Sequence, residues 1–223
     1  MNPPDGGHAG SPDARLLRLL REAETHFPAG ELAAELGVPE PALEASLAGL
    51  REAGFDIEDR PGEGYRLIGS PDRLIADDLH SRLGGCELAR EILVFEETTS
   101  TNDVAARLGR EGHAGGVAVF AERQTSGRGR FGRRWESTAR EGLWFSLLLR
   151  PGWPASQWVR LTTWAGVAVA GAIERVAGQS AKIKWPNDVL VDGRKVAGIL
   201  TECSTDSSGR MFAVVGIGLN VSW

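Results

Sequence analysis

Arginine and glycine dominate one segment of this chain, residues 124–135, which reads QTSGRGRFGRRW. Its last nine residues contain four Arg and three Gly. Glycine permits backbone conformations and close approaches that other residues forbid, and guanidinium groups are bidentate donors to carboxylates and phosphates. The segment is therefore predicted to be a loop that folds around an anion and is mobile when empty. By composition alone, a solvated loop or a nonspecific nucleic-acid contact fits equally well.

Lysine is rare in this chain, because 22 of the 25 basic residues are Arg and only Lys182, Lys184 and Lys195 are Lys. An ammonium group is a compact point charge that can approach an acyl phosphate where the planar fork of Arg cannot. Lys182 is interpreted as a solvated strand residue. Lys184 and Lys195 remain as candidates for chemistry.

Hydroxyl groups cluster at residues 98–102, TTSTN, which follow a predicted strand and open a predicted helix. One hydroxyl is expected to cap that helix. A run of neutral hydroxyls suits a polar, uncharged ligand group such as a urea, which needs donors and acceptors rather than an ion pair. Ser100 and Thr101 are therefore candidate ligand contacts.

A predicted hairpin brings a cation and a carboxylate together after the segment KWPND, residues 184–188. If Asp192 and Gly193 form a two-residue turn, residue 190 pairs with 195 and residue 188 with 197. Lys195 and Asp188 would then be diagonal neighbours, within roughly 7–8 Å at Cα. A bulge would break this inference, and an ordinary surface ion pair worth about 0–1 kcal/mol is the open alternative.

Two glycines at alternate positions, Gly216 and Gly218, lie in the segment GIGLN at the end of the last predicted strand. Glycine inside a strand often marks the close approach of a ligand or another backbone. The segment is a weak signal by itself.

The elements that position these residues fall into two groups. Residues 13–24, 30–36 and 39–53 have helical apolar spacing, and residues 55–68 alternate around a Gly-rich tip. This order predicts a winged helix-turn-helix at residues 13–69, after a disordered start at 1–12.

From residue 90 the pattern changes to strands separated by two helices, at 102–109 and 157–176. This order predicts an α+β fold, with a mixed and largely antiparallel sheet and helices packed on one face. The expected strands are residues 92–95, 117–121, 143–149, 189–191, 196–202 and 211–217.

Charge and composition separate the same two units and exclude several classes of protein. Residues 1–70 have 6 Arg against 13 acidic residues, a balance of 6 − 13 = −7, whereas the rest of the chain has 19 − 17 = +2. The longest apolar tract, near residues 161–173, is too short to span a bilayer, and no signal peptide is recognisable. Cys86 and Cys203 have no metal-ligand spacing and indicate free thiols in a reducing compartment. A cytoplasmic protein without membrane contact is expected.

Taken in order, the segments STN, GRGRFGRRW, KWPND, RKVAGIL and GIGLN resemble biotin protein ligase, from about Leu16 to the end of the chain. Each segment is weak, but the ordered set is specific. The resemblance implies a fold similar to class II aminoacyl-tRNA synthetases at residues 70–223. It also implies an enzyme of the biotin-[acetyl-CoA-carboxylase] ligase type, which forms biotinyl-5′-AMP from biotin and Mg-ATP. The biotin would pass to a lysine of the biotin carboxyl carrier protein.

The resemblance also implies a role for each site residue. Ser100, Thr101 and Gln124 would bind the ureido ring, and Gly127, Arg128 and Gly198 would line the biotin site. Lys195 would hold the carboxylate and α-phosphate, with Arg128 and Arg130 as the other catalytic candidates and Arg130 closing the loop. The nucleotide side would comprise Trp135 on adenine with Asn187, Asp188 and Asn220, and Asp188 is the candidate nearest Mg²⁺. A homodimer through the sheet edge is a further expectation of the family.

Two departures from the family pattern matter. The expected recognition helix contains Glu40, Glu44 and Glu52 but only one basic residue, Arg51, so weak or absent DNA binding is expected unless Arg60 and Arg66 on the wing suffice. Family members normally continue past GIGLN into a small C-terminal β-barrel, so a C-terminal truncation is expected here.

Two alternative functions stay open. A lipoate or octanoate transferase would share the catalytic fold, although a saturated acyl chain does not need the hydroxyl run. A transcriptional repressor that senses biotin without ligating it would use the winged helix.

Overall fold

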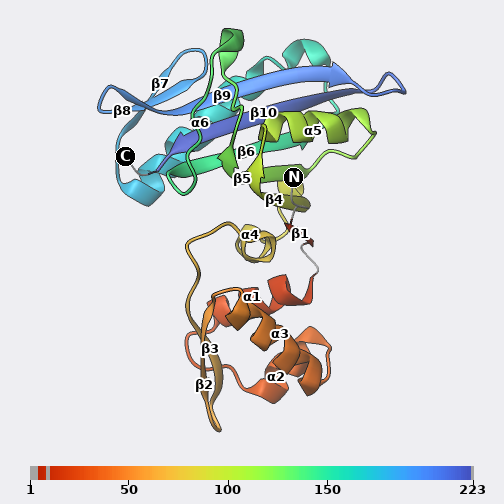
Figure 1. Ribbon diagram of the computed structural model, residues 1–223, viewed down its shortest axis with the longest axis vertical. Helices are drawn as coiled ribbons and strands as arrows, with labels where there is room; N and C mark the ends of the chain where they lie inside the picture. Colours follow the sequence, from red (N-terminus) through yellow and green to blue (C-terminus); the bar gives the residue numbers. More distant parts are fainter. Residues whose placement is uncertain (1–4, 9–10, 222–223) are drawn as a thin grey trace. The chain divides into compact units, whose positions relative to one another are not determined.

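The computed structural model describes residues 5–8 and 11–221, and the chain divides into two compact units, Gly6–Cys86 and one that consists mainly of Glu87–Trp223 (Figure 1). Strand β1 (Asp5–His8) lies within the range 1–12 that was expected to be disordered. A short strand needs only backbone hydrogen bonds, so composition did not reveal it. Residues 1–4 and 9–10, which belong to the same expectation, lie outside the described residues.

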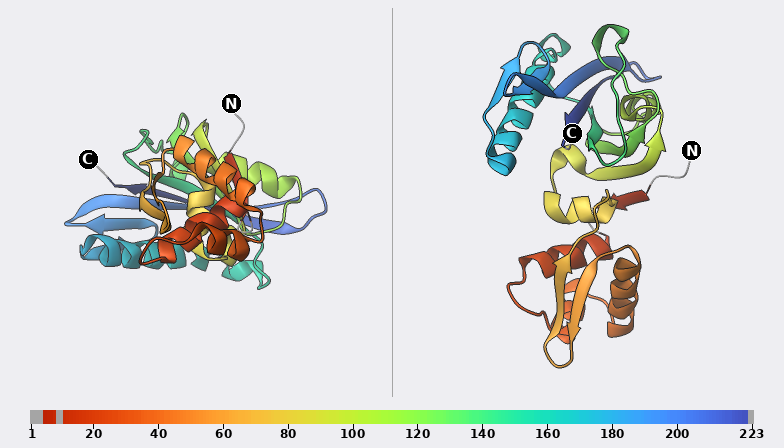
Figure 2. Two further views of the ribbon diagram at one scale, coloured as in Figure 1. Left: turned by 90° about the horizontal axis from the view of Figure 1, so that it is seen from below. Right: turned by 60° about the vertical axis from the view of Figure 1, so that its left-hand side comes forward.

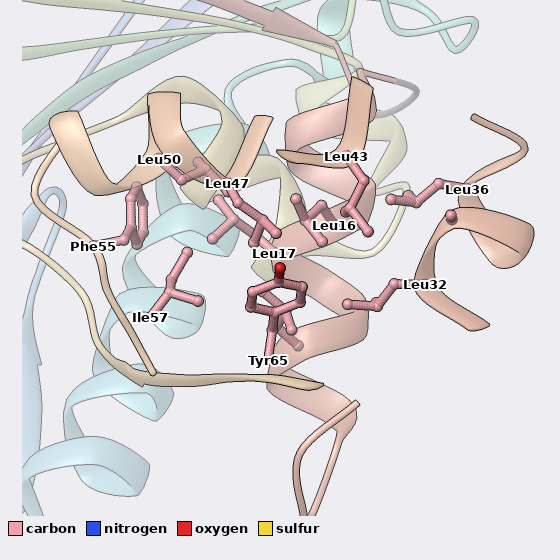
Figure 3. Packing of buried hydrophobic residues seen from close by; sticks show 12 residues of the cluster. Leu16, Leu17, Leu32, Leu36, Leu43, Leu47, Leu50, Phe55, Ile57 and Tyr65 are labelled. Atoms are coloured by element: carbon pink, nitrogen blue, oxygen red, sulfur yellow. The ribbon is translucent and has the colours of Figure 1, made fainter. Parts of the chain in front are cut away.

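The N-terminal unit contains three helices followed by a β-hairpin. The elements are α1 (Pro12–Glu22), α2 (Ala29–Leu36), α3 (Glu40–Glu52), β2 (Asp56–Arg60) and β3 (Gly64–Gly69). Leucines from all three helices, including Leu17, Leu32 and Leu47, surround Tyr65 of the hairpin in one apolar cluster (Figure 3). This unit is the expected winged helix-turn-helix.

A fourth helix, α4 (Ala76–Leu83), also belongs to the N-terminal unit. The Ser11 hydroxyl donates to Asp77 at 2.6 Å, and Arg21 of α1 forms an ion pair with Asp78. The units therefore divide between Cys86 and Glu87, later than the expected boundary between residues 69 and 70. These polar contacts tie α4 to α1, and the sequence pattern did not show them.

The larger unit is built on a mixed sheet, as expected. Its strands follow the order β4-β5-β6-β10-β9-β8-β7, in which β4 and β5 are parallel and the pairs from β5 to β7 are antiparallel. The edge strand β7 lies outside the expected strand ranges, although Lys182 within it was interpreted as a strand residue. The helices and strands of the larger unit are β4 (Glu91–Thr98), α5 (Thr101–Arg110), β5 (Val117–Gln124), β6 (Gly142–Leu149), α6 (Arg160–Ala177), β7 (Ala181–Lys184), β8 (Asp188–Val191), β9 (Arg194–Thr205) and β10 (Met211–Asn220).

The two long helices cover opposite faces of this sheet, which corrects the expectation that they pack on one face. Val104 and Leu108 of α5 cluster with Phe212 and Val214 of β10. Val169 of α6 clusters instead with the odd-numbered residues of β10, such as Val215. Successive strand residues point to opposite faces, so α5 and α6 sandwich the sheet (Figure 2, right). Helical periodicity identifies a buried stripe but does not say which face of the sheet the stripe meets.

None of the helices in residues 11–221 combines the length and apolar character needed to cross a membrane.

Candidate functional site

The hydroxyl cluster lies where α5 begins, beside the end of β5. Parallel pairing sets Thr98 opposite Gln124, so the Gln124 side chain reaches the first turn of α5. Gln124 Oε1 accepts hydrogen bonds from Thr101 N at 2.8 Å and from Thr101 Oγ1 at 3.2 Å. Ser100 occupies the N-cap position but its hydroxyl makes no capping bond. The expected hydroxyl cap is therefore wrong, because the amide of Gln124 satisfies that backbone donor instead.

Below this cluster a polar network runs into the sheet. The fully buried Ser146 hydroxyl lies 2.7 Å from Thr101 Oγ1 and 2.6 Å from Asn102 Oδ1. Asn102 Nδ2 in turn donates to Glu202 Oε2 at 2.7 Å. A Cβ on Gly216 would lie 2.0 Å from Asn102 Oδ1, so this glycine makes room for the amide. Buried polar side chains that satisfy one another in this way fix each other's position.

The lysine hairpin forms as expected except for a bulge. Asp192 and Gly193 both have positive φ, 49° and 76°, which is typical of a type I′ turn, and Leu190 pairs with Lys195. The register then shifts, so that Asp188 pairs with Gly198 rather than residue 197. The bulge does not separate the charges, because Lys195 Nζ lies 2.8 Å from Asp188 Oδ1.

Trp135 fills the space left by two glycines on neighbouring strands. A Cβ on Gly198 of β9 would lie 2.8 Å from its ring, and a Cβ on Gly218 of β10 would lie 2.5 Å away. Lys195 Nζ sits 5.0 Å from the ring centroid, a cation–π contact, and Trp144 packs edge-on at 6.2 Å. The buried indole N–H of Trp135 has no hydrogen-bond partner among the described residues.

Each end of the Arg-rich loop is fixed differently. Arg128 forms ion pairs with Asp103 at 2.8 Å and with Glu202 at 2.7 Å. Arg130 instead donates to the side-chain oxygen of Asn187 at 3.2 Å, and Asn187 Nδ2 donates to the Ile199 carbonyl. The loop therefore spans from α5 and β9 to the start of β8.

Two cavities meet at Trp135 and Lys195. The first, about 50 Å³, is lined by the hydroxyl cluster, by the Arg-rich loop of residues 124–135, which we call the lid, and by the glycines of β9 and β10. The second, about 310 Å³, contains Asn220, Trp144 and Glu141. Of the expected site residues, Ser100, Thr101, Gln124, Arg128, Arg130, Asn187 and Gly198 line the first cavity, Asn220 lines the second, and Trp135 and Lys195 line both.

The remaining candidates lie at the edges of this arrangement. Gly127 is buried within the lid itself, and a Cβ added to it would lie 2.4 Å from the Trp135 carbonyl oxygen. Asp188 lines neither cavity, but it forms an ion pair with Lys195, which lines both. Lys182 and Lys184 are exposed on the edge strand β7 and line neither cavity. Lys195 is thus the lysine that the fold places at the site.

The first cavity thus combines neutral hydrogen-bonding groups with the cations Lys195 and Arg130. Two family models match the chain. The model described as "Biotin/lipoate A/B protein ligase family" matches residues 94–220, more than half of the chain, and the "HTH domain" model matches residues 14–66. The chain belongs to the biotin/lipoate A/B protein ligase family. The α+β fold preceded by a helix-turn-helix unit is confirmed.

Individual members of the family are similar over most of this sequence. The bifunctional ligase/repressor BirA of Bacillus subtilis is 35% identical over 208 residues, which are 93% of this chain and 64% of that protein. The biotin--[acetyl-CoA-carboxylase] ligase of Mycobacterium tuberculosis is 41% identical over 138 residues, 60% of this chain and 50% of that protein. The structure of Aquifex aeolicus biotin protein ligase with biotin and ATP is 38% identical with a TM-score of 0.51, covering 59% of this chain and 53% of that one. The chain thus spans less than two thirds of these relatives.

Sequence reasoning missed three residues of this polar network. Asn102 was quoted within STN without a role, Ser146 lies inside an apolar strand far from the recognised segments, and Glu202 lies two residues past the segment RKVAGIL. The only available signal was a polar residue at an inward position of an otherwise apolar strand. Such a residue needs a partner, and here the partners are Thr101, Asn102 and Arg128.

A resident metal site is not built into the described residues, which contain no group of three His, Cys, Asp or Glu able to hold an ion. Asp188 is a single carboxylate and already carries Lys195 at 2.8 Å. Mg²⁺ usually binds proteins through one or two carboxylates plus substrate phosphates.

Proposed function

We propose that this chain is an ATP-dependent biotin protein ligase, which forms biotinyl-5′-AMP and passes biotin to a lysine of a biotin carboxyl carrier protein. One observation carries the proposal. The neutral cluster of Thr101 and Gln124, which suits a ureido ring, shares a cavity with Lys195, which suits a carboxylate undergoing phosphate transfer. The names of the relatives support the same substrate.

Under this proposal the first cavity takes biotin. Ser100, Thr101 and Gln124 hold the ureido ring, and Gly127 and Gly198 let the ring system approach the backbone. The cavity of about 50 Å³ is smaller than the 300–1,000 Å³ typical of ligand pockets, so the lid must move for biotin to enter. The second cavity takes the nucleotide, with Trp135 against adenine and with Asn187, Asp188 and Asn220 along the phosphate and ribose side.

Catalysis then needs no covalent bond to the enzyme. The biotin carboxylate attacks the α-phosphate of Mg-ATP, pyrophosphate leaves, and the amine of the carrier lysine later displaces AMP from the mixed anhydride. Lys195, at the junction of the cavities, neutralises charge on the carboxylate and the α-phosphate. Arg130 closes the lid over the adenylate. Positioning and charge stabilisation of this kind account for most of the acceleration in such reactions.

Pyrophosphate release with biotin, Mg²⁺ and ATP tests the proposal. We expect biotin-dependent release that falls at least about 100-fold in Lys195→Ala, since removing one preorganised donor costs roughly that factor. Lys182→Ala is the matched control, because that lysine is exposed on β7 and outside both cavities. Equal loss in both variants, or release without biotin, contradicts the assignment of Lys195.

A second candidate function, biotin-responsive repression, is favoured by the helix-turn-helix match. The α3 surface argues for weak DNA binding. Glu44 accepts a hydrogen bond from Tyr65, and Arg51 donates to the Ile57 carbonyl and lies over the Tyr65 ring. On the wing, Arg60 pairs with Glu58 at 3.1 Å. Two of the three cations near a DNA surface are therefore committed to internal contacts.

Fluorescence anisotropy with biotin-operator DNA at low salt separates these functions. We expect affinity no tighter than the roughly 10⁻⁴–10⁻⁶ M of nonspecific binding, with or without biotinyl-AMP. Nanomolar binding in the presence of biotinyl-AMP would instead support the repressor. Light scattering in the same buffers measures whether the chain forms the homodimer that we propose through its sheet edge.

A further inference from the structure

Arg128 lines the first cavity, but its guanidinium is paired with this protein's own carboxylates. Its two terminal nitrogens contact the two oxygens of Glu202 at 2.9 and 2.7 Å, the bidentate geometry that makes guanidinium–carboxylate pairs strong and specific. Asp103 adds a third contact at 2.8 Å. The guanidinium therefore faces two carboxylates, and a ligand carboxylate would have to displace one of them.

Glu202 is itself fixed from the interior of the sheet. Asn102 Nδ2 donates to Glu202 Oε2 at 2.7 Å, and Asn102 rests on the fully buried Ser146. The same Ser146 touches Thr101 of the proposed ureido pocket. Asp103, by contrast, is half-exposed, and Arg128 is the one partner of its carboxylate among the described residues. Glu202 is thus the carboxylate that links Arg128 to the buried network.

The base of the loop is joined by two backbone hydrogen bonds, whereas the tip has one side-chain hydrogen bond among the described residues, from Arg130 to Asn187. Trp135 N donates to the Gly127 carbonyl at 2.9 Å, and Gly129 N donates to the Arg133 carbonyl at 2.7 Å, so the strands flanking the tip are joined. The tip, Arg130–Gly132, carries Phe131 with 87% of its surface exposed and a positive φ of 59°. The tip alone would move when the lid opens.

We infer that Arg128 and Glu202 form the anchor of the lid, and that Glu202 is a positioning residue that holds Trp135 and Arg130 over the site. Arg128 is then not a donor to biotin, which changes the role that family resemblance implies for it. Within the proposed function, loosening the anchor should weaken ligand retention while leaving the chemical step to Lys195 and Arg130.

Limited trypsin digestion without any ligand tests the anchor independently of biotin. The lid offers cleavage after Arg128, Arg130, Arg133 and Arg134. We expect Glu202→Gln to raise the rate of cleavage after Arg133 and Arg134 at least fivefold, and the matched variant Asp103→Asn to raise it less than twofold. Cleavage after Arg110 in α5 serves as the folding reference. Equal lid cleavage in wild type and Glu202→Gln would overturn the inference.

A double-mutant cycle and ligand kinetics complete the test. If Arg128 and Glu202 act as a unit, trypsin should cleave the double variant Arg128→Gln/Glu202→Gln no faster than it cleaves Arg128→Gln alone. Additive increases in the cleavage rate would contradict the pair. Glu202→Gln should speed biotin dissociation and raise KM for biotin about tenfold, with kcat within twofold. A fall in kcat with unchanged KM contradicts a positioning role. If wild type binds no biotin, the proposed function fails while the digestion still decides the anchor.

Discussion

Substitution of Gly216 by alanine should damage the site by displacing the side chain of Asn102. Gly216 lies in β10 opposite Leu200, under the amide of Asn102. The added methyl group would lie 2.0 Å from Asn102 Oδ1 and 2.8 Å from its Cγ, closer than real Cβ contacts occur. Asn102 is buried and bonded on both sides, so it cannot swing away without breaking its contact to Ser146 or to Glu202.

The expected cost follows from this overlap. Forcing extra volume into a packed interior costs about 1–3 kcal/mol, and we expect about 2 kcal/mol here because the neighbour is a bonded amide rather than a flexible side-chain end. For a unit of this size, 1 kcal/mol shifts Tm by about 3–5 °C, so Tm should fall by roughly 6–10 °C. Since Asn102 holds Glu202, the lid should also become more sensitive to trypsin.

Tryptophan fluorescence reports this change selectively, because all seven Trp of the chain lie at or after residue 135, outside the helix-turn-helix unit. Gly166→Ala in α6 is the matched control, since its methyl group would lie 3.9 Å from the nearest atom, Ile199 Cδ1. That variant should be neutral or more stable by about 0.5–1 kcal/mol, as helical Gly→Ala changes are. An unchanged fluorescence midpoint in Gly216→Ala would refute the reasoning.

Three further predictions concern other parts of the chain. Gln124→Ala removes the acceptor for Thr101 N and should cost about 0.5–2 kcal/mol, as lost helix caps do, and at least tenfold in biotin affinity by calorimetry. The hydrogen bond to Glu44 raises the pKa of Tyr65 to about 12, so the stability of the N-terminal unit should fall as pH rises from about 10 to 12; circular dichroism should show this loss in wild type and not in Tyr65→Phe. The hydrogen bond from Ser208 lowers the pKa of Asp206, so its stabilisation should be present above about pH 4 and fade below it; Asp206→Asn should lose stability at neutral pH and show a smaller acid-dependent loss in urea titrations followed by fluorescence.

Local chemistry made much of this site predictable. The turn at Asp192 and Gly193 follows from residues that tolerate positive φ, and it places Lys195 opposite Leu190. The ion pair with Asp188 survives the bulge because a lysine side chain is long and flexible enough to absorb one residue of register. Strand periodicity and turn chemistry act over a few residues, so the sequence exposes them directly.

Long-range packing was less accessible. Nothing in the spacing of α5 or α6 indicates which face of the sheet each helix meets, since the same apolar stripe fits either face. The alternate glycines Gly216 and Gly218 correctly indicated a close approach, but the groups that approach are the side chains of Asn102 and Trp135. A glycine records that space is needed and not what fills it.

The arginines of the lid show why residue type alone could not assign roles. Arg128 and Arg130 stand two residues apart in the same motif, and both could bind an anion. Arg128 faces two carboxylates, whereas Arg130 contacts the neutral amide of Asn187 and the ring of Phe131. A cation that is already paired with a carboxylate gains little electrostatic free energy from a new anion, because one charge pair replaces another. A cation that contacts a neutral amide gains a charge pair that it did not have. The charge of the partner therefore assigns anion binding to Arg130 and anchoring to Arg128.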